Sequence, residues 1–384
     1  MEPLYIDANA GLGAKPEALD AYCEATQWFA NPSSTHPLGK MARQKLEEAR
    51  QRLCCSLGGP NGRLVFTSGG TEANALALTG LCGGAEQPPH VISSTLEHAS
   101  VINNLKRLQQ RQQIDLTIVT ASRSGRVCPD AIVKNLRPHT ALVSIVAICN
   151  ETGVFQPIDE IASLLRNHPA NLHTDAVQAV GRIPVDVEAW GVDAISFSGH
   201  KFGSVSGVGG LWLRKGLGVK ATLQGGGHEF GLRPGTENIA GALSMATALE
   251  CSYRDNDFQP LGALRDLFES QLREETRIEA GIEIIGQGEG RLPNTSCVRF
   301  IDCEADAIMM ALDLEGFAVS TGSACSSGSI DASPILVGMG LTTKEAKEAL
   351  RFSLGPALRE HSVRALSKTV CDIWHRIAAA RSSS

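Results

Sequence analysis

The residues of this chain with the clearest chemical potential are a lysine and an aspartate, each placed after an apolar run. Lys201 comes just after the apolar residues 192–197 and just before the Gly-rich residues 202–210. A short apolar run bounded by turn residues predicts a buried strand, so we expect Lys201 just past a strand end, where open α/β sheets bind their ligands. Asp175 and Gln178 follow a second apolar segment in the same way.

A lysine near a loop is by itself more often a solvated surface charge than a nucleophile. Its combination with Asp175 reverses that interpretation. A lysine that forms a Schiff base and an acidic residue that keeps a pyridinium nitrogen protonated are the two protein groups that a pyridoxal phosphate site requires. The pair therefore predicts such a site, with Lys201 as the point of attachment.

A Gly-rich turn between a predicted strand and a predicted helix is a candidate phosphate site. Residues 67–74 read Thr-Ser-Gly-Gly-Thr-Glu-Ala-Asn and include Gly70 and Thr71. Backbone N–H groups at a helix N-terminus, helped by the Thr71 hydroxyl, bind anions. Such turns are common and most bind no phosphate, but the position of this one ahead of Asp175 and Lys201 strengthens the interpretation. Neither the Walker spacing nor G-x-G-x-x-G occurs, so a nucleotide is the weaker ligand.

Residues 319–329 form a small-residue segment, Val-Ser-Thr-Gly-Ser-Ala-Cys-Ser-Ser-Gly-Ser, with a thiol at Cys325. Most cysteines are buried small hydrophobes, and this interpretation suits the other ten of the chain. It suits Cys325 poorly, because serine, glycine and alanine neighbours cannot build a core. The eleven cysteines are scattered and never spaced as C-x-x-C, so neither a disulfide framework nor a metal site is expected.

Length and composition indicate a globular enzyme of two domains. The chain has 384 residues, 43% of them hydrophobic and 20% charged, and its net charge is -6. Such a length usually divides into two cores, and an acidic balance favours neither nucleic acid nor anionic lipid as a partner. No segment approaches 18 uninterrupted apolar residues and no leader pattern opens the sequence, so we expect no membrane partner and a cytoplasmic location with reduced thiols.

The hydrophobic pattern predicts alternating strands and helices up to about residue 245. We expect strands at residues 64–66, 90–93, 116–119, 141–148, 193–197 and 211–213, with helices at 36–55 and 158–165. This alternation favours a mostly parallel sheet covered by helices. After residue 241 we expect a long helical stretch to 277, helices at 305–314 and from 361, and strands at 282–285, 297–301 and 351–354. The predicted domains are therefore 1–245 and 246–384, the second one α+β and carrying Cys325, with the N-terminal segment packed on it.

Several ordered motifs give the chain a resemblance to the cysteine desulfurases. The chain resembles the NifS/IscS-like subgroup of the class V aminotransferase-like enzymes, which belong to the fold type I pyridoxal phosphate enzymes with a seven-stranded sheet. The subgroup carries its catalytic cysteine in an S-x-G-S-A-C-S-S loop. The matching segments run almost end to end and are residues 31–36, 68–72, 97–98, 150–153, 173–178, 198–201, 233–238, 320–327 and 351–353.

The resemblance implies a role for each matched residue. Lys201 would bind pyridoxal 5'-phosphate covalently, Asp175 would pair with its ring nitrogen, and His98 would stack on the ring as a further catalytic residue. Arg351 would grip the substrate carboxylate, with Asn150 beside it. Gln178 and Asn150 would hydrogen-bond near the phenolic oxygen. The residues implied to hold the phosphate are Gly70, Thr71, Ser198, His200 and, from the second subunit of a homodimer, Thr236.

The resemblance also implies the reaction. The Cys325 thiolate would attack the sulfur of L-cysteine, become a persulfide and leave L-alanine, and the sulfur would pass to an acceptor protein or an iron–sulfur scaffold. Three segments depart from the family pattern, at residues 10–12 (Ala-Gly-Leu), 204–207 (Ser-Val-Ser-Gly) and 228–230 (His-Glu-Phe). They keep two alternatives open: a related lyase or transferase, such as a selenocysteine lyase or an enzyme of a dedicated sulfur-metabolite pathway, and a non-catalytic relative that binds the cofactor.

Overall fold

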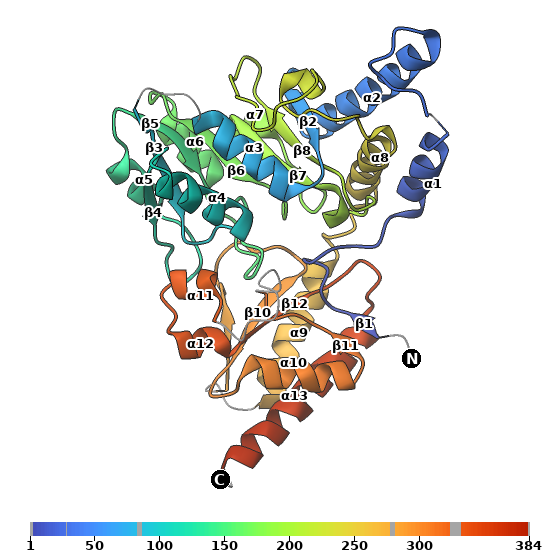
Figure 1. The fold of residues 1–384 in the computed structure, drawn as a ribbon. Coiled ribbons are helices and arrows are strands. Elements are labelled where there is room, and N and C mark those ends of the chain that lie inside the picture. The colour runs from blue at the N-terminus through green and yellow to red at the C-terminus, as the bar shows by residue number, and fades with distance from the viewer. Residues whose placement is uncertain (1–2, 28, 83–86, 277–280, 323–331, 383–384) are drawn as a thin grey trace.

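A computed structural model describes residues 3–27, 29–82, 87–276, 281–322 and 332–382 of the chain (Figure 1). Within these ranges the chain forms a seven-stranded sheet, a three-stranded sheet and a two-stranded sheet, with helices packed on them. In Figure 1 the largest sheet lies in the upper half of the molecule and the three-stranded sheet in the lower half. No helix in the described ranges is both long and apolar enough to cross a bilayer.

The seven-stranded sheet confirms the predicted α/β class. All of its neighbouring strand pairs are parallel except the two that involve β8, which runs antiparallel to both of its neighbours. In spatial order the strands are β2 (Arg63–Thr67), β8 (Gly209–Leu213), β7 (Ala194–Ser198), β6 (Asn171–Asp175), β5 (Thr140–Ser144), β3 (His90–Ser94) and β4 (Asp115–Val119).

Helices cover both faces of this sheet, which explains why its strands are buried almost throughout, except the edge strand β4. Along β2, for example, Val65 packs on one face while Leu64 and Phe66 pack on the other. One face is covered by α3 (Gly70–Cys82) and α4 (Ala99–Gln110). The opposite face is covered by α2 (Pro37–Ser56), α5 (Pro129–Asn135), α6 (Ile158–Leu165), α7 (Val187–Trp190) and α8 (Ile239–Asp255). Helix α1 (Pro16–Ala25) packs against α8.

The strand predicted at 141–148 is too long, because β5 ends at Ser144. The N–H of Val146 donates to the buried carboxyl of Glu97 (3.0 Å) instead of joining a strand ladder. The Glu97 side chain thus accepts the N–H of Val146, which is no longer available to pair with a neighbouring strand. The chain then turns through Asn150 toward the edge of the sheet where the parallel strands end.

The long helical stretch predicted after residue 241 is two helices. Helix α8 ends at Asn256, which has a left-handed backbone (φ 51°), and α9 (Leu261–Thr276) begins after Pro260. Many helices end at a left-handed residue, which is usually glycine and sometimes asparagine, and proline cannot continue a helix. The break brings α9 onto the three-stranded sheet.

The three-stranded sheet is antiparallel and has its own core. Its order is β12 (Ala349–Ser353), β10 (Thr295–Phe300) and β9 (Ile282–Ile285). Helices α9, α10 (Ala305–Leu314) and α13 (Glu360–Ser382) contribute to that core. The first strand of the chain, β1 (Leu4–Tyr5), pairs with β11 (Phe317–Ala318) beside it. The short helices α11 (Pro334–Gly338) and α12 (Thr343–Lys347) both precede β12 in the sequence.

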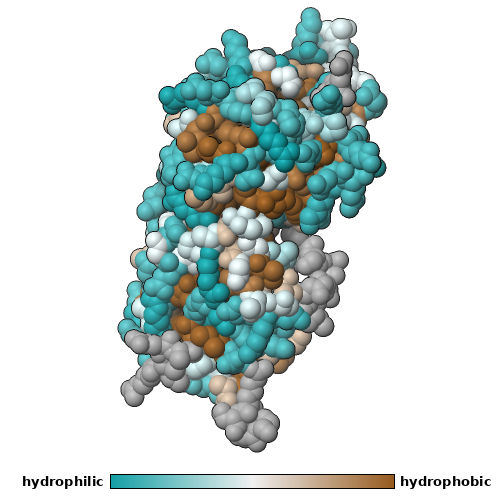
Figure 2. Space-filling model, turned by 90° about the vertical axis from the view of Figure 1, so that its left-hand side faces the viewer, coloured by the Kyte–Doolittle hydropathy of each residue, from teal (hydrophilic) through white to brown (hydrophobic). Residues whose placement is uncertain are grey.

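The surface of the face that carries β4, α5, α11 and α12 is mixed. Figure 2 shows hydrophobic residues in separate brown patches among hydrophilic ones on this face. Scattered apolar residues of this kind are normal for a folded protein and need no special account.

Candidate active site

A cavity of about 350 Å³ lies at the edge where the parallel strands end, next to β12 of the smaller sheet. This is the position at which open α/β sheets bind ligands. Apart from Cys325 and Thr236, every residue predicted for the site lines it. The lining residues that concern the chemistry are Asn9, Gly70, Thr71, Asn74, His98, Ser100, Asn150, Asp175, Gln178, Ser198, His200, Lys201 and Arg351.

Lys201 ends the 3-10 turn η1 (Gly199–Lys201) that directly follows β7. Its Nζ donates to the main-chain carbonyls of Asn9 (2.7 Å) and Ala10 (2.9 Å). The sequence departure at residues 10–12 therefore contacts the lysine through its backbone, which any residue type supplies. The two carbonyls hold the Lys201 ammonium in a fixed position at the cavity wall. Lys201 is therefore not a solvated surface charge.

Asp175 is the last residue of β6 and is buried. Its Oδ2 accepts from the Asn74 amide (2.7 Å) and its Oδ1 from the N–H of Val177 (3.0 Å). These two hydrogen bonds fix the orientation of the Asp175 carboxyl at the cavity wall, as pairing with a ring nitrogen would require. Asn74 also donates to the Ser100 hydroxyl (2.9 Å) and thereby links α3 to α4.

The N-terminus of α3 provides the expected anion site. A Cβ atom at Gly70 would lie 2.6 Å from Cγ2 of Val177, so only glycine lets the helix start this close to the turn after β6. Ser198 Oγ and His200 Nδ1 lie 2.9 Å apart beside it. Burial, and then Lys201 and Arg182, lower the pKa of His200 to about 4, so the ring is neutral and takes part through hydrogen bonds.

His98 caps α4 through its ring. Its Nδ1 accepts from the N–H of Ser100 (3.1 Å) and lies 2.8 Å from the Ser100 hydroxyl. Because Nδ1 is used as an acceptor, the proton of the neutral ring belongs on Nε2. The cap holds the ring at the wall of the cavity, as stacking on a flat ligand would require.

Arg351 lies in β12 and is 3% exposed. Its Nη2 pairs with Asp7 (2.6 Å) and its Nη1 donates to the carbonyl of Asn150 (3.0 Å). Its Nε is buried and finds no hydrogen-bond partner among the residues that the structure describes. Arg351 is thus both salt-bridged and available to a ligand through Nε.

Other buried polar atoms around the cavity are also without partners in the described part of the chain. They are Oδ1 of Asn74, Oδ1 of Asn150 and Oε1 of Gln178. A buried polar atom without a partner costs free energy, so such a group of atoms in one cavity indicates a polar ligand. Together with the placed lysine, the buried aspartate and the helix N-terminus, these residues fit pyridoxal phosphate.

Two buried glutamates near the cavity were part of the matched motifs but had no predicted role. Burial raises the pKa of Glu97 to about 8, with Asp175 adding to the rise. Burial likewise raises the pKa of Glu151 to about 7; its Oε2 accepts from the Ser333 hydroxyl (2.6 Å). Sequence patterns give no sign of either shift, because both depend on which groups surround the carboxyl.

Two predicted site residues are not among the described residues that line the cavity. Cys325 lies outside the described residues, whereas Gly322, just before that segment, lines the cavity. Thr236 is exposed and lines a separate hollow with Phe29, Asn31 and Ile239. It takes no part in the cavity of its own chain.

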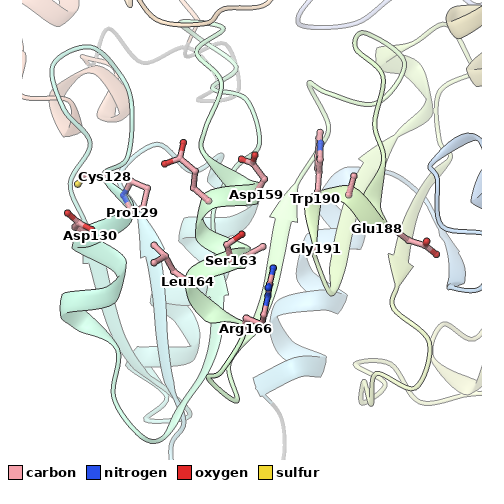
Figure 3. Close-up of a pocket in the computed structure, with 13 residues that line it drawn as sticks. Cys128, Pro129, Asp130, Asp159, Ser163, Leu164, Arg166, Glu188, Trp190 and Gly191 are labelled. Atoms are coloured by element: carbon pink, nitrogen blue, oxygen red, sulfur yellow. The ribbon is translucent and has the colours of Figure 1, made fainter.

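A larger and more open hollow of about 880 Å³ lies between α5, α6 and α7 (Figure 3). Asp130, Asp159, Arg166 and Trp190 are among the residues that line it. Among the described residues, no buried side-chain atom without a hydrogen-bond partner lies there. Of these two hollows, the smaller cavity is therefore the candidate chemical site, because it combines the Lys201 amine with buried polar atoms that have no partner among the described residues.

The departure at residues 228–230 is accommodated by an ion pair and an aromatic contact. Glu229 is buried and accepts from both Nη atoms of Arg50 (2.7 and 2.9 Å) and from the N–H of Phe66 (2.8 Å). The ring of Phe230 lies 4.9 Å from the Arg50 guanidinium and 5.3 Å from that of Arg63. Such contacts are cation–π interactions, so the Phe230 ring packs favourably against the two arginines.

Comparison with known proteins agrees with this geometry. The family model for aminotransferase class-V matches residues 4–366. The chain is 37% identical over 356 residues to the cysteine desulfurase IscS of Dictyoglomus turgidum, covering 92% of this chain and 89% of that one. A solved NifS-like protein matches with a TM-score of 0.88 and 29% identity (97% and 99% covered). SspA in complex with cysteine matches with a TM-score of 0.81 and 29% identity (92% and 99% covered). The chain belongs to the aminotransferase class-V family, whose enzymes depend on pyridoxal phosphate.

Proposed function

We propose that this protein is a cysteine desulfurase, which converts L-cysteine to L-alanine and passes the sulfur on from Cys325. The observation that carries the proposal is one cavity that combines the Lys201 amine, the Asp175 carboxylate and the Nε of Arg351, which has no partner in the described part of the chain. An amine, a carboxylate and a guanidinium are the groups that cofactor attachment, ring protonation and substrate binding require. The relatives named cysteine desulfurase and the neighbour solved with cysteine support the choice of substrate.

Pyridoxal phosphate, when bound, supplies an electron sink for the pair of electrons left at the amino acid Cα. Lys201, Asp175, His98, Gln178 and the α3 N-terminus would hold it. The Nζ of Lys201 would move the proton at Cα, because it is the amine at the cavity wall. Arg351 would bind the substrate carboxylate through Nε and turn the amino acid so that its side chain faces the segment that carries Cys325.

The sulfur step is proposed as an attack by the Cys325 thiolate on Sγ of the substrate. A bond forms between the two sulfur atoms and the Cβ–Sγ bond breaks, so that its electron pair stays with Cβ. A proton then converts Cβ to the methyl group of alanine, and Cys325 is left as a persulfide. The outer sulfur leaves with the acceptor, for which we propose a carrier protein or an iron–sulfur scaffold.

The test compares the wild type with Cys325→Ser and Lys201→Ala. The wild type should be yellow, form a persulfide and release alanine from L-cysteine. Cys325→Ser should keep the visible band and lose persulfide formation and most alanine release, because a hydroxyl is a far weaker nucleophile than a thiolate near neutral pH. Undiminished alanine release from L-cysteine by this variant would contradict the persulfide mechanism. Lys201→Ala should lose the band that hydride reduction fixes to the wild type.

The same assay separates the two alternatives. A selenol is a better leaving group than a thiol and can depart without thiolate attack. Alanine release from L-selenocysteine that survives Cys325→Ser, with little release from L-cysteine by the wild type, would favour a selenocysteine lyase. A wild type that binds pyridoxal phosphate but releases no alanine from a panel of amino acids would favour a non-catalytic relative.

A homodimer is part of the proposal. Phe29 is 87% exposed and lines the hollow that contains Thr236, while Leu38, Met41 and Phe230 are also large exposed hydrophobic residues. We propose that these side chains belong to the dimer interface, because interfaces between subunits bury apolar residues that a single chain leaves exposed. We propose that Thr236 completes the phosphate site of a second subunit. We also propose a cytoplasmic location.

A further inference from the structure

Asn9 lines the cavity, and both polar atoms of its side chain are hydrogen-bonded. It lies between β1 and α1 and is 1% exposed. A buried amide in a loop is costly unless it is fully paired. The side-chain Nδ2 donates to the carbonyl of Asn150 (3.2 Å) and to Oγ1 of Thr295 (3.0 Å). Its Oδ1 accepts from Arg182 (2.5 Å) and from Asn294 (3.2 Å).

The main chain of Asn9 is held just as firmly. Its N–H donates to the Ser353 hydroxyl (3.0 Å). Its carbonyl accepts from Gln178 Nε2 (3.1 Å) and from Lys201 Nζ (2.7 Å). One residue therefore contacts the proposed attachment lysine and a proposed cofactor ligand directly.

These partners come from both halves of the fold. Lys201, Gln178 and Arg182 follow strands of the seven-stranded sheet, whereas Asn294, Thr295 and Ser353 belong to the three-stranded sheet or the turn before it. Arg351 lies on the same strand as Ser353, two residues earlier. Asn9 thus joins the strand that carries Arg351 to the turn that carries Lys201.

The carbonyl of Asn150 connects Asn9 to the two residues proposed to bind the substrate, Asn150 and Arg351. It accepts from two donors, Asn9 Nδ2 and Arg351 Nη1. Two donors on one carbonyl fix the plane of that peptide, and with it the side chain of Asn150 and the guanidinium of Arg351. The atoms left unpartnered by the described residues, Asn150 Oδ1 and Arg351 Nε, are those that would meet the amino acid.

We propose that Asn9 is a positioning residue that holds Asn150 and Arg351 in register with Lys201. The inference rests on the proposed function, since it assumes that Arg351 and Asn150 bind the amino acid. It predicts that the donor atom Nδ2 of Asn9 sets the affinity for the amino acid, while the cofactor itself is held by other residues.

Asn9→Asp is the most informative variant. An aspartate keeps an acceptor for Arg182 and Asn294, so the buried guanidinium of Arg182 retains its partner. It replaces the Nδ2 donor by an oxygen, which repels the carbonyl of Asn150. Thr295→Val is the matched control, because it removes the other partner of Nδ2 and leaves the bond to Asn150 intact.

The experiment measures four quantities on each protein: kcat and KM for L-cysteine, the calorimetric dissociation constant of L-alanine on the cofactor-loaded protein, the dissociation constant of pyridoxal phosphate on the apoprotein, and the melting temperature. For Asn9→Asp we expect KM and the L-alanine constant to rise about tenfold, the size of a lost hydrogen bond that leaves an unpaired group. We expect kcat and the pyridoxal phosphate constant to change less than about threefold, and Thr295→Val to stay within about twofold throughout.

An L-alanine dissociation constant within about twofold of wild type for Asn9→Asp would overturn the inference. So would an equal loss in Thr295→Val, since Asn9 would then act only through general stability. If Asn9→Asp does not fold, the L-alanine constant of Asn9→Ala decides by the same criteria. A wild type that releases no alanine refutes the proposed function instead, whereas an active wild type with an unaffected Asn9→Asp refutes only the role of Asn9.

Discussion

Glu97→Gln should change how the stability of the protein depends on pH. Glu97 is buried, and its Oε1 accepts from the Ser94 hydroxyl (2.6 Å) and from the N–H of Val146 (3.0 Å). Its Oε2 finds no partner among the described residues. A glutamine can keep both acceptor bonds with its oxygen and place its amide nitrogen where Oε2 stands. The substitution thus removes a titrating group and leaves the shape of the side chain unchanged.

The size of the effect follows from the pKa of Glu97, which burial raises from 4.5 to about 8. Between these two pH values the folded carboxyl keeps a proton that the unfolded chain has released. Glu97 therefore makes its full contribution to the free energy of unfolding below pH 4.5. The wild type loses this contribution as the pH rises through 8. Three pH units at about 1.36 kcal/mol each give a relative gain for Glu97→Gln on the order of 4 kcal/mol between pH 5 and pH 8.

The assay is urea unfolding of both apoproteins at pH 5 and pH 8, compared as the difference in free energy of unfolding. The apoprotein is used so that loss of cofactor does not contribute. Glu151 also has a raised pKa, but it titrates in both proteins and cancels in the difference. If the stability of Glu97→Gln relative to wild type is the same at both pH values, Glu97 is ionised in the fold and the reasoning is wrong.

Three further substitutions test other parts of the site. Gly70→Ala should weaken binding of pyridoxal phosphate to the apoprotein by tenfold or more, on the order of 1.4 kcal/mol, because its Cβ would lie 2.6 Å from Val177; equilibrium dialysis measures this, and unchanged affinity would show that α3 can shift freely. Asp175→Asn should keep the bond from Val177 but lose the charge that pairs with the ring nitrogen, so alanine release should fall at least a hundredfold, about 2.7 kcal/mol; near-normal turnover would exclude that pairing. Thr236→Ala should weaken cofactor affinity in a dimer of unchanged sedimentation, whereas a monomer with full wild-type activity would contradict the shared site.

Much of the site could be predicted because its residues are local features of the sequence. Lys201 and Asp175 end apolar runs, and Gly70 and Thr71 lie in a strand-to-helix turn. Parallel strands bring all their carboxyl ends to one edge, so residues that end separate strands meet there without further information. The α/β class followed from the hydrophobic pattern and the family from the resemblance of ordered motifs, and both were confirmed.

The resemblance to a family implied a role for each matched residue, but it could not predict which groups surround that residue in the fold. Arg351 was predicted as a substrate ligand, and its salt bridge to Asp7 appears only in the fold. The end of β5 depends on a hydrogen bond from Val146 to Glu97, two residues far apart in the sequence. Neither contact has a local signal, because each joins segments that only the packed structure brings together.

The sequence by itself therefore determined the order of strands and helices, the residue types of the site and the side of the sheet on which they gather. Only the tertiary structure decided that Asn9 joins both sheets, that Asn74 holds Asp175, and that Glu97 keeps its proton near neutral pH. The physical reason is the range of the interactions. Backbone preference and hydrophobic period act over a few residues, whereas burial, orphaned polar atoms and pKa values depend on every segment packed around a group.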